Sequence, residues 1–206
     1  RLRSTAPDGL EIEPLYTAED PHAQGAAGFP GVFPYVRGSA PVGGWLIRQE
    51  YDDPRPSVCK AQIELDLGRG VEAVWLRVGP RHGCRVLTTK ELDDLLGSVD
   101  LTATSTYIEG GSDALAVAAG FLAVAASRGV SPEALRGGFA FDPIGLLAGE
   151  GRIQGGLRAR LAELCDLAAW CASNAPGLRA VDVSSDPYDR GGASAVQELA
   201  YSIATG

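Results

Sequence analysis

The amino-acid sequence predicts an α/β fold, namely a TIM-type (β/α)8 barrel of which this chain supplies about the first five βα units after an extended N-terminal arm. Strand-like apolar runs alternate with helical runs in five successive repeats, which is the order of a parallel sheet joined by right-handed crossovers. Several strand-like runs end in polar residues, as strands do at the carboxyl rim of a barrel that faces a site. An open doubly wound sheet is the alternative.

Each predicted strand is a short run that is either apolar throughout or alternating. The run at 70–78, GVEAVWLRV, is typical of a buried strand, and the run at 99–107, VDLTATSTY, alternates with period two. The five predicted strands cover 45–51, 70–78, 99–107, 138–141 and 178–184. The polar residues assigned to strand ends are Thr104, Ser105, Asp142, Ser184 and Ser185.

The predicted helices lie between these strands, and some carry clear end signals. Thr88 and Glu91 have the spacing of a capping box, in which each side chain satisfies a backbone N–H of the other. Ser112 is predicted to cap a long helix that Gly129 ends. The predicted helices cover 57–67, 88–96, 112–128, 154–174 and 194–204, with one helical turn at 145–148.

The chain is predicted to divide into an extended arm, residues 1–43, and a partial barrel domain, residues 44–206. The arm holds many Pro and Gly and shows no clear periodicity. A closed barrel needs eight strands and roughly 250 residues. Because only five strands are predicted, we expect that the natural chain continues or that another chain completes the sheet. Because position 1 is Arg rather than Met, we also expect that further residues preceded it.

Composition excludes several classes of protein. The 206 residues are 45% apolar and 21% charged, which is ordinary for a globular domain, and no run of about 18 apolar residues predicts a membrane span. The net charge of −8 argues against nucleic acid or an anionic membrane as a partner. The cysteines lack CxxC spacing and are interpreted as free thiols in a reducing cytoplasm: Cys59, Cys84, Cys165 and Cys171.

Four segments, taken in order, are similar to one enzyme family. They are PDGLEIEPLYTAED within residues 5–20, GFPGVFPYVRG at 28–38, WLIRQ at 45–49 and GASAVQELAYSIATG at 192–206. Together they resemble the arm, the first barrel strand and the helix after the fifth strand of the adenosylcobalamin-dependent methylmalonyl-CoA mutases. The resemblance implies a barrel and arm that wrap an acyl-CoA thioester, with a separate corrinoid-binding domain. The enzymes of this family in some bacteria consist of a large catalytic subunit and a small subunit of similar fold that does no chemistry.

The chain departs from the family pattern where the family places its chemistry. Aligning Arg190–Ala193 on the turn after the fifth strand places Pro187 where the family has a His. Because a proline side chain can neither donate nor accept a proton, the resemblance implies that this acid or hydrogen-bond donor is lost. The other departures are GSAPVGGW at 38–45, which lacks the family's Tyr, STYIEG at 105–110 and FDPIG at 141–145.

Both histidines lie in predicted loops. The run DPHAQG at 20–25 matches D-x-H-x-x-G, with which cobalamin domains present a His to cobalt while the Asp holds the other ring nitrogen. That motif is expected between a strand and a helix, whereas AAGFPGVFP, which follows here, cannot form a helix. We therefore interpret the match at His22 as coincidental and predict no metal site. His82 is interpreted as a surface residue in a turn, although the family often has a His there near the substrate.

These features predict a non-catalytic, small-subunit-like component of a methylmalonyl-CoA mutase, which supports a partner's isomerisation of methylmalonyl-CoA and succinyl-CoA in a heterodimer. The chain is predicted to bind no cofactor, because adenosylcobalamin belongs to the partner, a large catalytic mutase subunit or another copy of a barrel chain. One alternative is an active acyl-CoA isomerase with diverged residues, and the other is a barrel repurposed for another ligand. The side chains facing a retained pocket would be Arg48, Tyr107, Asp142 and Tyr188.

Overall fold

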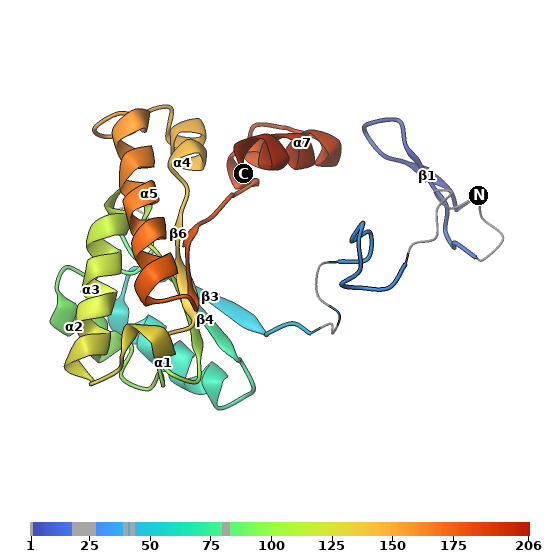
Figure 1. The fold of residues 1–206 in the computed structure, drawn as a ribbon. Helices are drawn as coiled ribbons and strands as arrows, with labels where there is room; N and C mark the ends of the chain where they lie inside the picture. Colours follow the sequence, from blue (N-terminus) through green and yellow to red (C-terminus); the bar gives the residue numbers. More distant parts are fainter. Residues whose placement is uncertain (1, 18–27, 39–40, 42–43, 80–82) are drawn as a thin grey trace. The chain divides into compact units, whose positions relative to one another are not determined.

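The computed structural model describes residues 2–17, 28–38, 41, 44–79 and 83–206 of the chain (Figure 1). The chain forms two compact units, Arg1–Trp45 and Leu46–Gly206. In the first unit, β1 (Ser4–Thr5) pairs antiparallel with β2 (Glu11–Ile12). An ion pair of 2.7 Å between Arg3 and Glu13 joins the two ends of this hairpin. Among the described residues of the first unit, the large apolar side chains of Leu10, Phe29 and Phe33 are all exposed.

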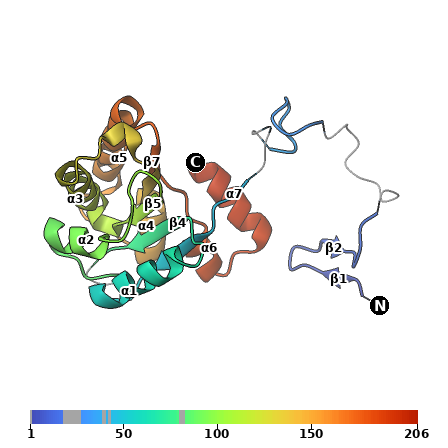
Figure 2. The same cartoon turned by 90° about the horizontal axis from the view of Figure 1, so that it is seen from below.

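The second unit contains a five-stranded parallel sheet whose strands alternate with helices (Figures 1 and 2). The strands are β3 (Arg48–Tyr51), β4 (Ala73–Arg77), β5 (Ser105–Glu109), β6 (Gly137–Phe141) and β7 (Leu178–Val181). The helices are α1 (Pro56–Leu67), α2 (Thr89–Leu95), α3 (Ala114–Ser127), α4 (Pro143–Glu150), α5 (Leu157–Asn174), α6 (Asp186–Arg190) and α7 (Ala195–Thr205). Short 3-10 turns, η1 (Gly111–Asp113) and η2 (Pro132–Ala134), precede α3 and β6.

The strands lie in the sheet in their sequence order, β3-β4-β5-β6-β7. Each crossover therefore moves in the same direction, and these five strands contain no point at which the order reverses, as it does in a doubly wound sheet. Figure 1 shows α2, α3 and α5 together on one side of the sheet. Helices α6 and α7 follow β7, and α6 contacts α4.

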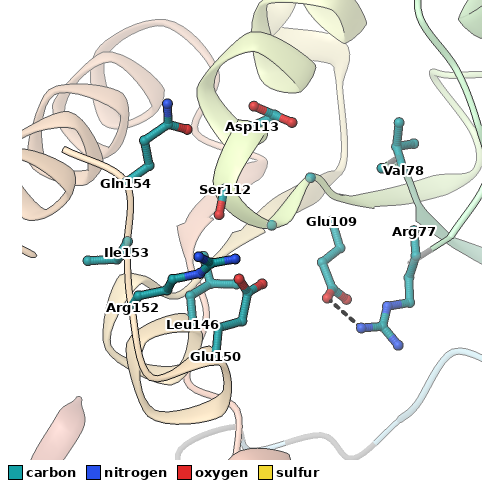
Figure 3. A pocket seen from close by; sticks show the side chains of 13 residues that line it. Arg77, Val78, Glu109, Ser112, Asp113, Leu146, Glu150, Arg152, Ile153 and Gln154 are labelled. Carbon is teal, nitrogen blue, oxygen red and sulfur yellow. Dashed lines mark hydrogen bonds and ion pairs between the residues drawn. The ribbon is translucent and has the colours of Figure 1, made fainter. Parts of the chain in front are cut away.

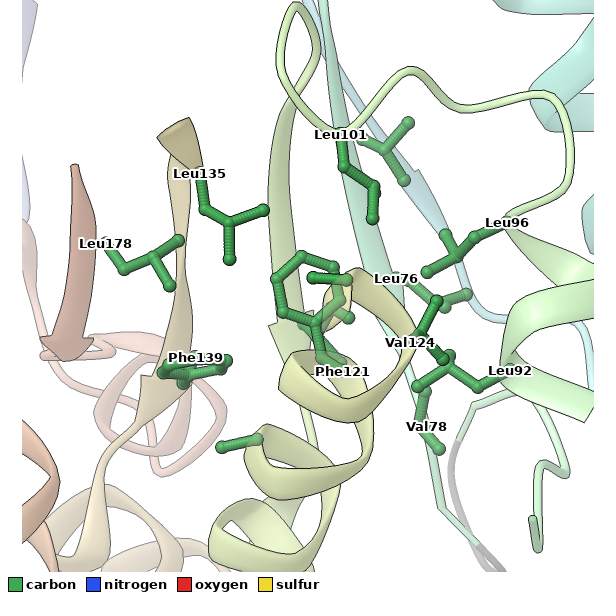
Figure 4. Close-up of a cluster of buried hydrophobic side chains, with 14 of the residues drawn as sticks. Leu76, Val78, Leu92, Leu96, Leu101, Phe121, Val124, Leu135, Phe139 and Leu178 are labelled. Atoms are coloured by element: carbon green, nitrogen blue, oxygen red, sulfur yellow. The ribbon is translucent and has the colours of Figure 1, made fainter. Parts of the chain in front are cut away.

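The hydrophobic core lies between the sheet and helices α1, α2, α3 and α5 (Figure 4). Alternate strand residues point into it, because successive side chains of a strand face opposite sides. Val74, Leu76 and Ile108 are fully buried there, and Phe121 of α3 meets Phe139 of β6 edge to face, with ring centroids 6.1 Å apart. Arg128, just beyond α3, ties α3 to α2 by donating to the Asp93 carboxylate at 2.6 Å and to the Leu96 carbonyl oxygen at 3.0 Å.

Most predicted elements are present, and three local predictions are wrong. Residues 99–104 form turns rather than a strand, because the Asp100 carboxylate accepts hydrogen bonds from Thr102 and Ala103, so β5 begins only at Ser105. Thr104 and Ser105 thus lie at the start of that strand, not at its carboxyl end. Ser112 does not cap α3, because η1 intervenes and the N-cap is Asp113. Helix α6 was not predicted.

The helix-end signals predicted from the sequence are present at the start of α2 and at the end of α3. Thr88 and Glu91 form the predicted capping box at the start of α2. Gly129 follows the C-cap of α3 with a φ of +71°, a backbone conformation that glycine adopts without strain. The turn predicted at 145–148 is part of the longer helix α4, which Asp142 caps by accepting from the Gly145 N–H at 2.8 Å.

Candidate functional site

The strand face opposite the core carries paired charged and aromatic side chains. We call it the open face and define it by six half-buried or exposed residues of β3, β4 and β5: Arg48, Glu50, Trp75, Arg77, Tyr107 and Glu109. In β4 and β5 they alternate with the buried residues Val74, Leu76, Thr106 and Ile108, so they share one side of the sheet. The strand register brings Glu50, Trp75 and Tyr107 into one row across the sheet.

Arg48 packs against two aromatic rings on the open face. Its guanidinium lies 4.5 Å from the centroid of the Tyr107 ring and 5.2 Å from that of the Trp75 ring. Both distances lie within the range of cation–π attraction. Two of the predicted substrate-facing residues, Arg48 and Tyr107, are therefore brought together, and they contact each other.

Arg77 joins two carboxylates of neighbouring strands. It donates to Glu50 at 3.2 Å and to Glu109 at 3.0 Å, and Glu109 also accepts from the Trp75 indole N–H at 3.2 Å. Burial by itself would lower the pKa of Arg77. The negative charges of Glu109 and Glu50 and the hydrogen bonds to them outweigh burial, so the pKa of Arg77 lies above its ordinary value. For Glu109, burial outweighs the attraction of Arg77, so the pKa of this carboxyl group lies above its ordinary value.

Asp142 holds the ends of two strands together. Its buried carboxylate accepts from the Gly145 N–H at 2.8 Å and from the Ser184 N–H at 2.9 Å, so it fixes the start of α4 next to the segment that follows β7. Nearby Asp182 has a raised pKa because of desolvation of its carboxyl group and the charge of Asp142. The Asp142 side chain thus has a structural role in capping, and both its oxygen atoms are engaged.

Tyr188, the fourth predicted substrate-facing residue, packs on α7. Its ring stacks on that of Tyr201 with centroids 4.8 Å apart, and its hydroxyl lies 3.4 Å from that of Thr205. Pro187 lies in the first turn of α6. The structure therefore distributes the four predicted residues over the open face, the cap of α4 and the α6–α7 contact, and does not gather them into one site.

A pocket of about 590 Å³ opens at the carboxyl ends of β4 and β5 (Figure 3). One side is formed by Arg77 and Glu109, and another by Glu150 and Arg152 near the end of α4. Ser112 lies between them, in the turn after β5. None of the four predicted substrate-facing residues lines this pocket. Arg152 is exposed and forms no ion pair with a described residue, so its guanidinium is available to a ligand.

Sequence reasoning missed Arg77, Glu109 and Arg152 as pocket residues. A signal for the first two is that each is the charged last residue of an otherwise apolar or alternating strand. Misplacing β5 by several residues hid that signal for Glu109. Arg152 lies in the Gly-rich loop between α4 and α5, where the sequence contains no motif that marks it.

The described residues contain no group of three or more His, Cys, Asp or Glu side chains that could hold a metal ion. His22 and His82 both lie outside the described residues. The described residues that follow the D-x-H-x-x-G match, 28–34, are irregular at 28–29 and form turns and a bend at 30–34, and the motif's expected helix is not found among them. Among the described helices, none is both long and apolar enough to cross a membrane.

Comparison with known proteins relates the chain to one family. The family described as methylmalonyl-CoA mutase matches residues 72–206. The chain is 38% identical to the methylmalonyl-CoA mutase small subunit of Streptomyces virginiae, over 100% of this chain and 32% of that protein. It is 30% identical to the small subunit of Propionibacterium freudenreichii subsp. shermanii, over 100% of this chain and 31% of that protein.

A large subunit is also similar. The chain is 24% identical to the probable methylmalonyl-CoA mutase large subunit of Mycobacterium bovis, over 97% of this chain and 30% of that protein. The chain thus spans about a third of the length of the curated relatives that it matches.

Proposed function

Because the chain belongs to the methylmalonyl-CoA mutase family, we propose that it is part of a non-catalytic small subunit, which supports a large catalytic subunit in a heterodimer. The isomerisation of methylmalonyl-CoA and succinyl-CoA then takes place in the partner. The higher identity to small subunits, 38% and 30%, than to a large subunit, 24%, supports this assignment. Another copy of a barrel chain is the alternative partner.

The observation that carries the proposal is that the side chains of the open face bind each other. Arg48 lies against Trp75 and Tyr107, and Arg77 is shared by Glu50 and Glu109. An acyl-CoA on this face would have to displace bulky side chains and break half-buried ion pairs. Such a face suits a protein whose sheet surface is filled by its own side chains rather than by a substrate.

We further propose that the sheet is part of a (β/α)8 barrel, with residues 44–206 as its first portion and residues 1–43 as an arm. The strand order is sequential, with α2, α3 and α5 on one side (Figure 1), and in the described part of the unit Leu46–Gly206 the residues of the open face stay half-buried or exposed. Closing the sheet on itself buries that face and removes the unpaired edges of β3 and β7. The open face would then line the barrel interior.

The absence of family chemistry in this chain is also part of the proposal. Pro187, which takes the position of the family's His, lies in the first turn of α6, where its ring can neither donate nor accept a proton. We propose that adenosylcobalamin is held by the partner and that the complex acts in the cytoplasm. When bound, that group supplies the radical chemistry of the rearrangement.

Co-expression of the chain with a large mutase subunit tests this function. We expect a one-to-one complex in native mass spectrometry, and unchanged mutase activity when Pro187→Ala is introduced into this chain. The isolated chain should give no spectral change with adenosylcobalamin and no heat with an acyl-CoA. Binding of either compound by the isolated chain, or failure to form the complex, contradicts the proposal.

The pocket beside Glu109 favours a second function, that of a mutase-like barrel which binds another ligand. Its free Arg152 and the Ser112 hydroxyl offer donors at the carboxyl ends of the strands, where barrel sites usually lie. A screen of small carboxylates by calorimetry distinguishes the two functions. Binding that Arg152→Ala abolishes would support a ligand-binding role, whereas no binding agrees with a purely supporting subunit.

A further inference from the structure

Two buried thiols from separate elements meet at the carboxyl edge of the sheet. Cys59 lies in the first turns of α1, and Cys84 follows β4. Both residues are 0% exposed, and the two thiols lie close enough for each to shift the pKa of the other. None of the proposed functions uses either thiol.

Backbone contacts hold the two cysteines next to the same segment. The Cys59 thiol donates to the carbonyl oxygen of Asp53 at 3.2 Å, and the Arg85 N–H donates to that of Pro54 at 3.2 Å. The chain at 84–85 and the start of α1 therefore converge on residues 53–54. These contacts bring the two cysteines to the same segment without depending on any interaction between the thiols.

Cys84 is also tied to the end of β4. Its N–H donates to the Arg77 carbonyl oxygen at 2.8 Å, its carbonyl oxygen accepts from the Gly79 N–H at 3.1 Å, and it forms an isolated parallel bridge with Val78. Val78 and Gly79 line the pocket at the carboxyl ends of β4 and β5. A covalent bond from Cys84 to Cys59 would consequently anchor one wall of that pocket to α1.

We propose that Cys59 and Cys84 form an oxidisable dithiol, which a peroxide converts into an intrachain disulfide that links α1 to the segment after β4. The oxidant must be close to water in size because both sulfurs are fully buried. Hydrogen peroxide meets this requirement, whereas a bulky disulfide such as oxidised glutathione does not.

The chemistry proceeds in two balanced steps. The Cys59 thiolate attacks one peroxide oxygen, the O–O bond breaks, and one water leaves after protonation, which gives a sulfenic acid. The Cys84 sulfur then attacks the Cys59 sulfur, the S–O bond breaks and a second water leaves. Two thiols and one peroxide thus give one disulfide and two waters, and the two sulfurs lose the two electrons that the oxygens gain.

The two thiols differ in how strongly they resist ionisation. Burial raises the pKa of both thiols, that of Cys84 to about 12, and the nearby Cys84 thiol partly offsets this rise at Cys59. Cys59 is therefore the thiol that reacts with peroxide first, and Cys84 is the thiol that resolves the sulfenic acid. The raised pKa values predict slow oxidation compared with an exposed thiolate.

Treatment of the folded chain with hydrogen peroxide, followed by alkylation in urea and peptide mapping, tests the proposal. We expect Cys59 and Cys84 to be lost as alkylatable thiols, and a peptide that joins them to be lighter than its two separate parts by the mass of two hydrogen atoms, whatever the oxidation state of exposed Cys165. We also expect the melting temperature to rise by several degrees and to return after reduction, since a cross-link restricts the unfolded chain.

Two variants serve as controls. Cys165→Ser removes the exposed thiol and should leave the cross-link unchanged, whereas Cys59→Ala should abolish it without protecting Cys165 from peroxide. Recovery of Cys59 and Cys84 as alkylated thiols, in wild-type chain whose Cys165 is already oxidised to the sulfinic acid, would overturn the proposal. Pairing of either residue with Cys165 or Cys171 in the folded chain would do the same.

Discussion

The two faces of the sheet are built from adjacent residues of the same strands, and they differ in almost every property. On the covered face, Val74, Leu76 and Ile108 are fully buried and touch the helices. On the open face, Trp75, Arg77 and Glu109 are half-buried and bond to each other. The covered face packs against helices, whereas the contacts described for the open face within the unit Leu46–Gly206 run from strand to strand.

Because of this difference, the two faces contribute to the stability of the fold in different ways. The covered face gains from the removal of apolar area from water, which depends on the helices packed against it. The open face gains from ion pairs and cation–π contacts, which contribute less while part of each side chain remains in water. Substitutions on the two faces should therefore differ most clearly in the free energy of unfolding.

The largest expected effect comes from the covered face. Ile108→Ala leaves a cavity between β5 and the helices and should lower the free energy of unfolding by about 2–5 kcal/mol. Its neighbour Tyr107→Ala, on the open face, should cost about 1 kcal/mol, because it removes the ring that packs on Arg48. Urea denaturation followed by circular dichroism measures both. An equal loss in the two variants would mean that the faces are equally well packed.

The second effect tests the ion pairs of the open face. Arg77→Met leaves Glu50 and Glu109 without their shared cation, and the side chain of Arg77 is 31% exposed. We expect the free energy of unfolding to fall by about 1–3 kcal/mol, which lies between the values measured for exposed and for buried ion pairs. The double variant Arg77→Met, Glu109→Gln should recover part of it, because one unpaired carboxylate is then absent. A double variant less stable than either single one would contradict this pairing.

Local signals predicted local structure well. The capping box of α2 depends on Thr88 and Glu91, three residues apart, and Gly129 ends α3 through its own backbone freedom. The same reasoning failed at 99–104, where period-two alternation favoured a strand. There the Asp100 carboxylate, by accepting from the Thr102 hydroxyl at 2.7 Å and its N–H at 2.9 Å, stabilises a competing turn.

The candidate site depended on information that the sequence carries only across long separations. The contact between Arg48 and Tyr107 requires the register of three strands. Asp142 was a candidate for substrate contact, but its carboxylate accepts a hydrogen bond from the Ser184 N–H, which lies 42 residues further along the chain. Which strand ends meet in a pocket follows from sheet order, and no sequence motif marks Arg152, so this residue could be found only with the fold.

The third prediction uses pH to compare two carboxyl groups. The pKa of Asp182 is raised in the folded chain by desolvation and by Asp142, so the folded state holds its proton more tightly than the unfolded state. Its contribution to stability is therefore lost as the pH rises through the interval that starts near the ordinary value of 3.8. Asp182→Asn should gain stability relative to wild type over that interval.

Asp100 provides the control of opposite sign. Hydrogen bonds from Thr102 and Ala103 lower the pKa of Asp100, so its contribution appears as the pH rises toward 3.8 and persists above it. Asp100→Asn should therefore lose stability relative to wild type at neutral pH. Free energies of unfolding of both variants, measured from acid to neutral pH, test this. If the difference from wild type changed with pH in the same direction for both variants, the opposite pKa shifts of Asp182 and Asp100 would be refuted.

The smallest effect is expected on α7, whose apolar side chains do not touch the covered face. Leu199 is 64% exposed and Ile203 is 78% exposed, although the helix is well capped by Ser194 and Gln197. Leu199→Ser and Ile203→Ser should each change the free energy of unfolding of this chain by less than about 0.5 kcal/mol, the range of ordinary surface substitutions. A loss above about 1 kcal/mol would show that α7 packs on this chain more closely than its exposure indicates, since burial of a leucine or isoleucine side chain contributes at least that much.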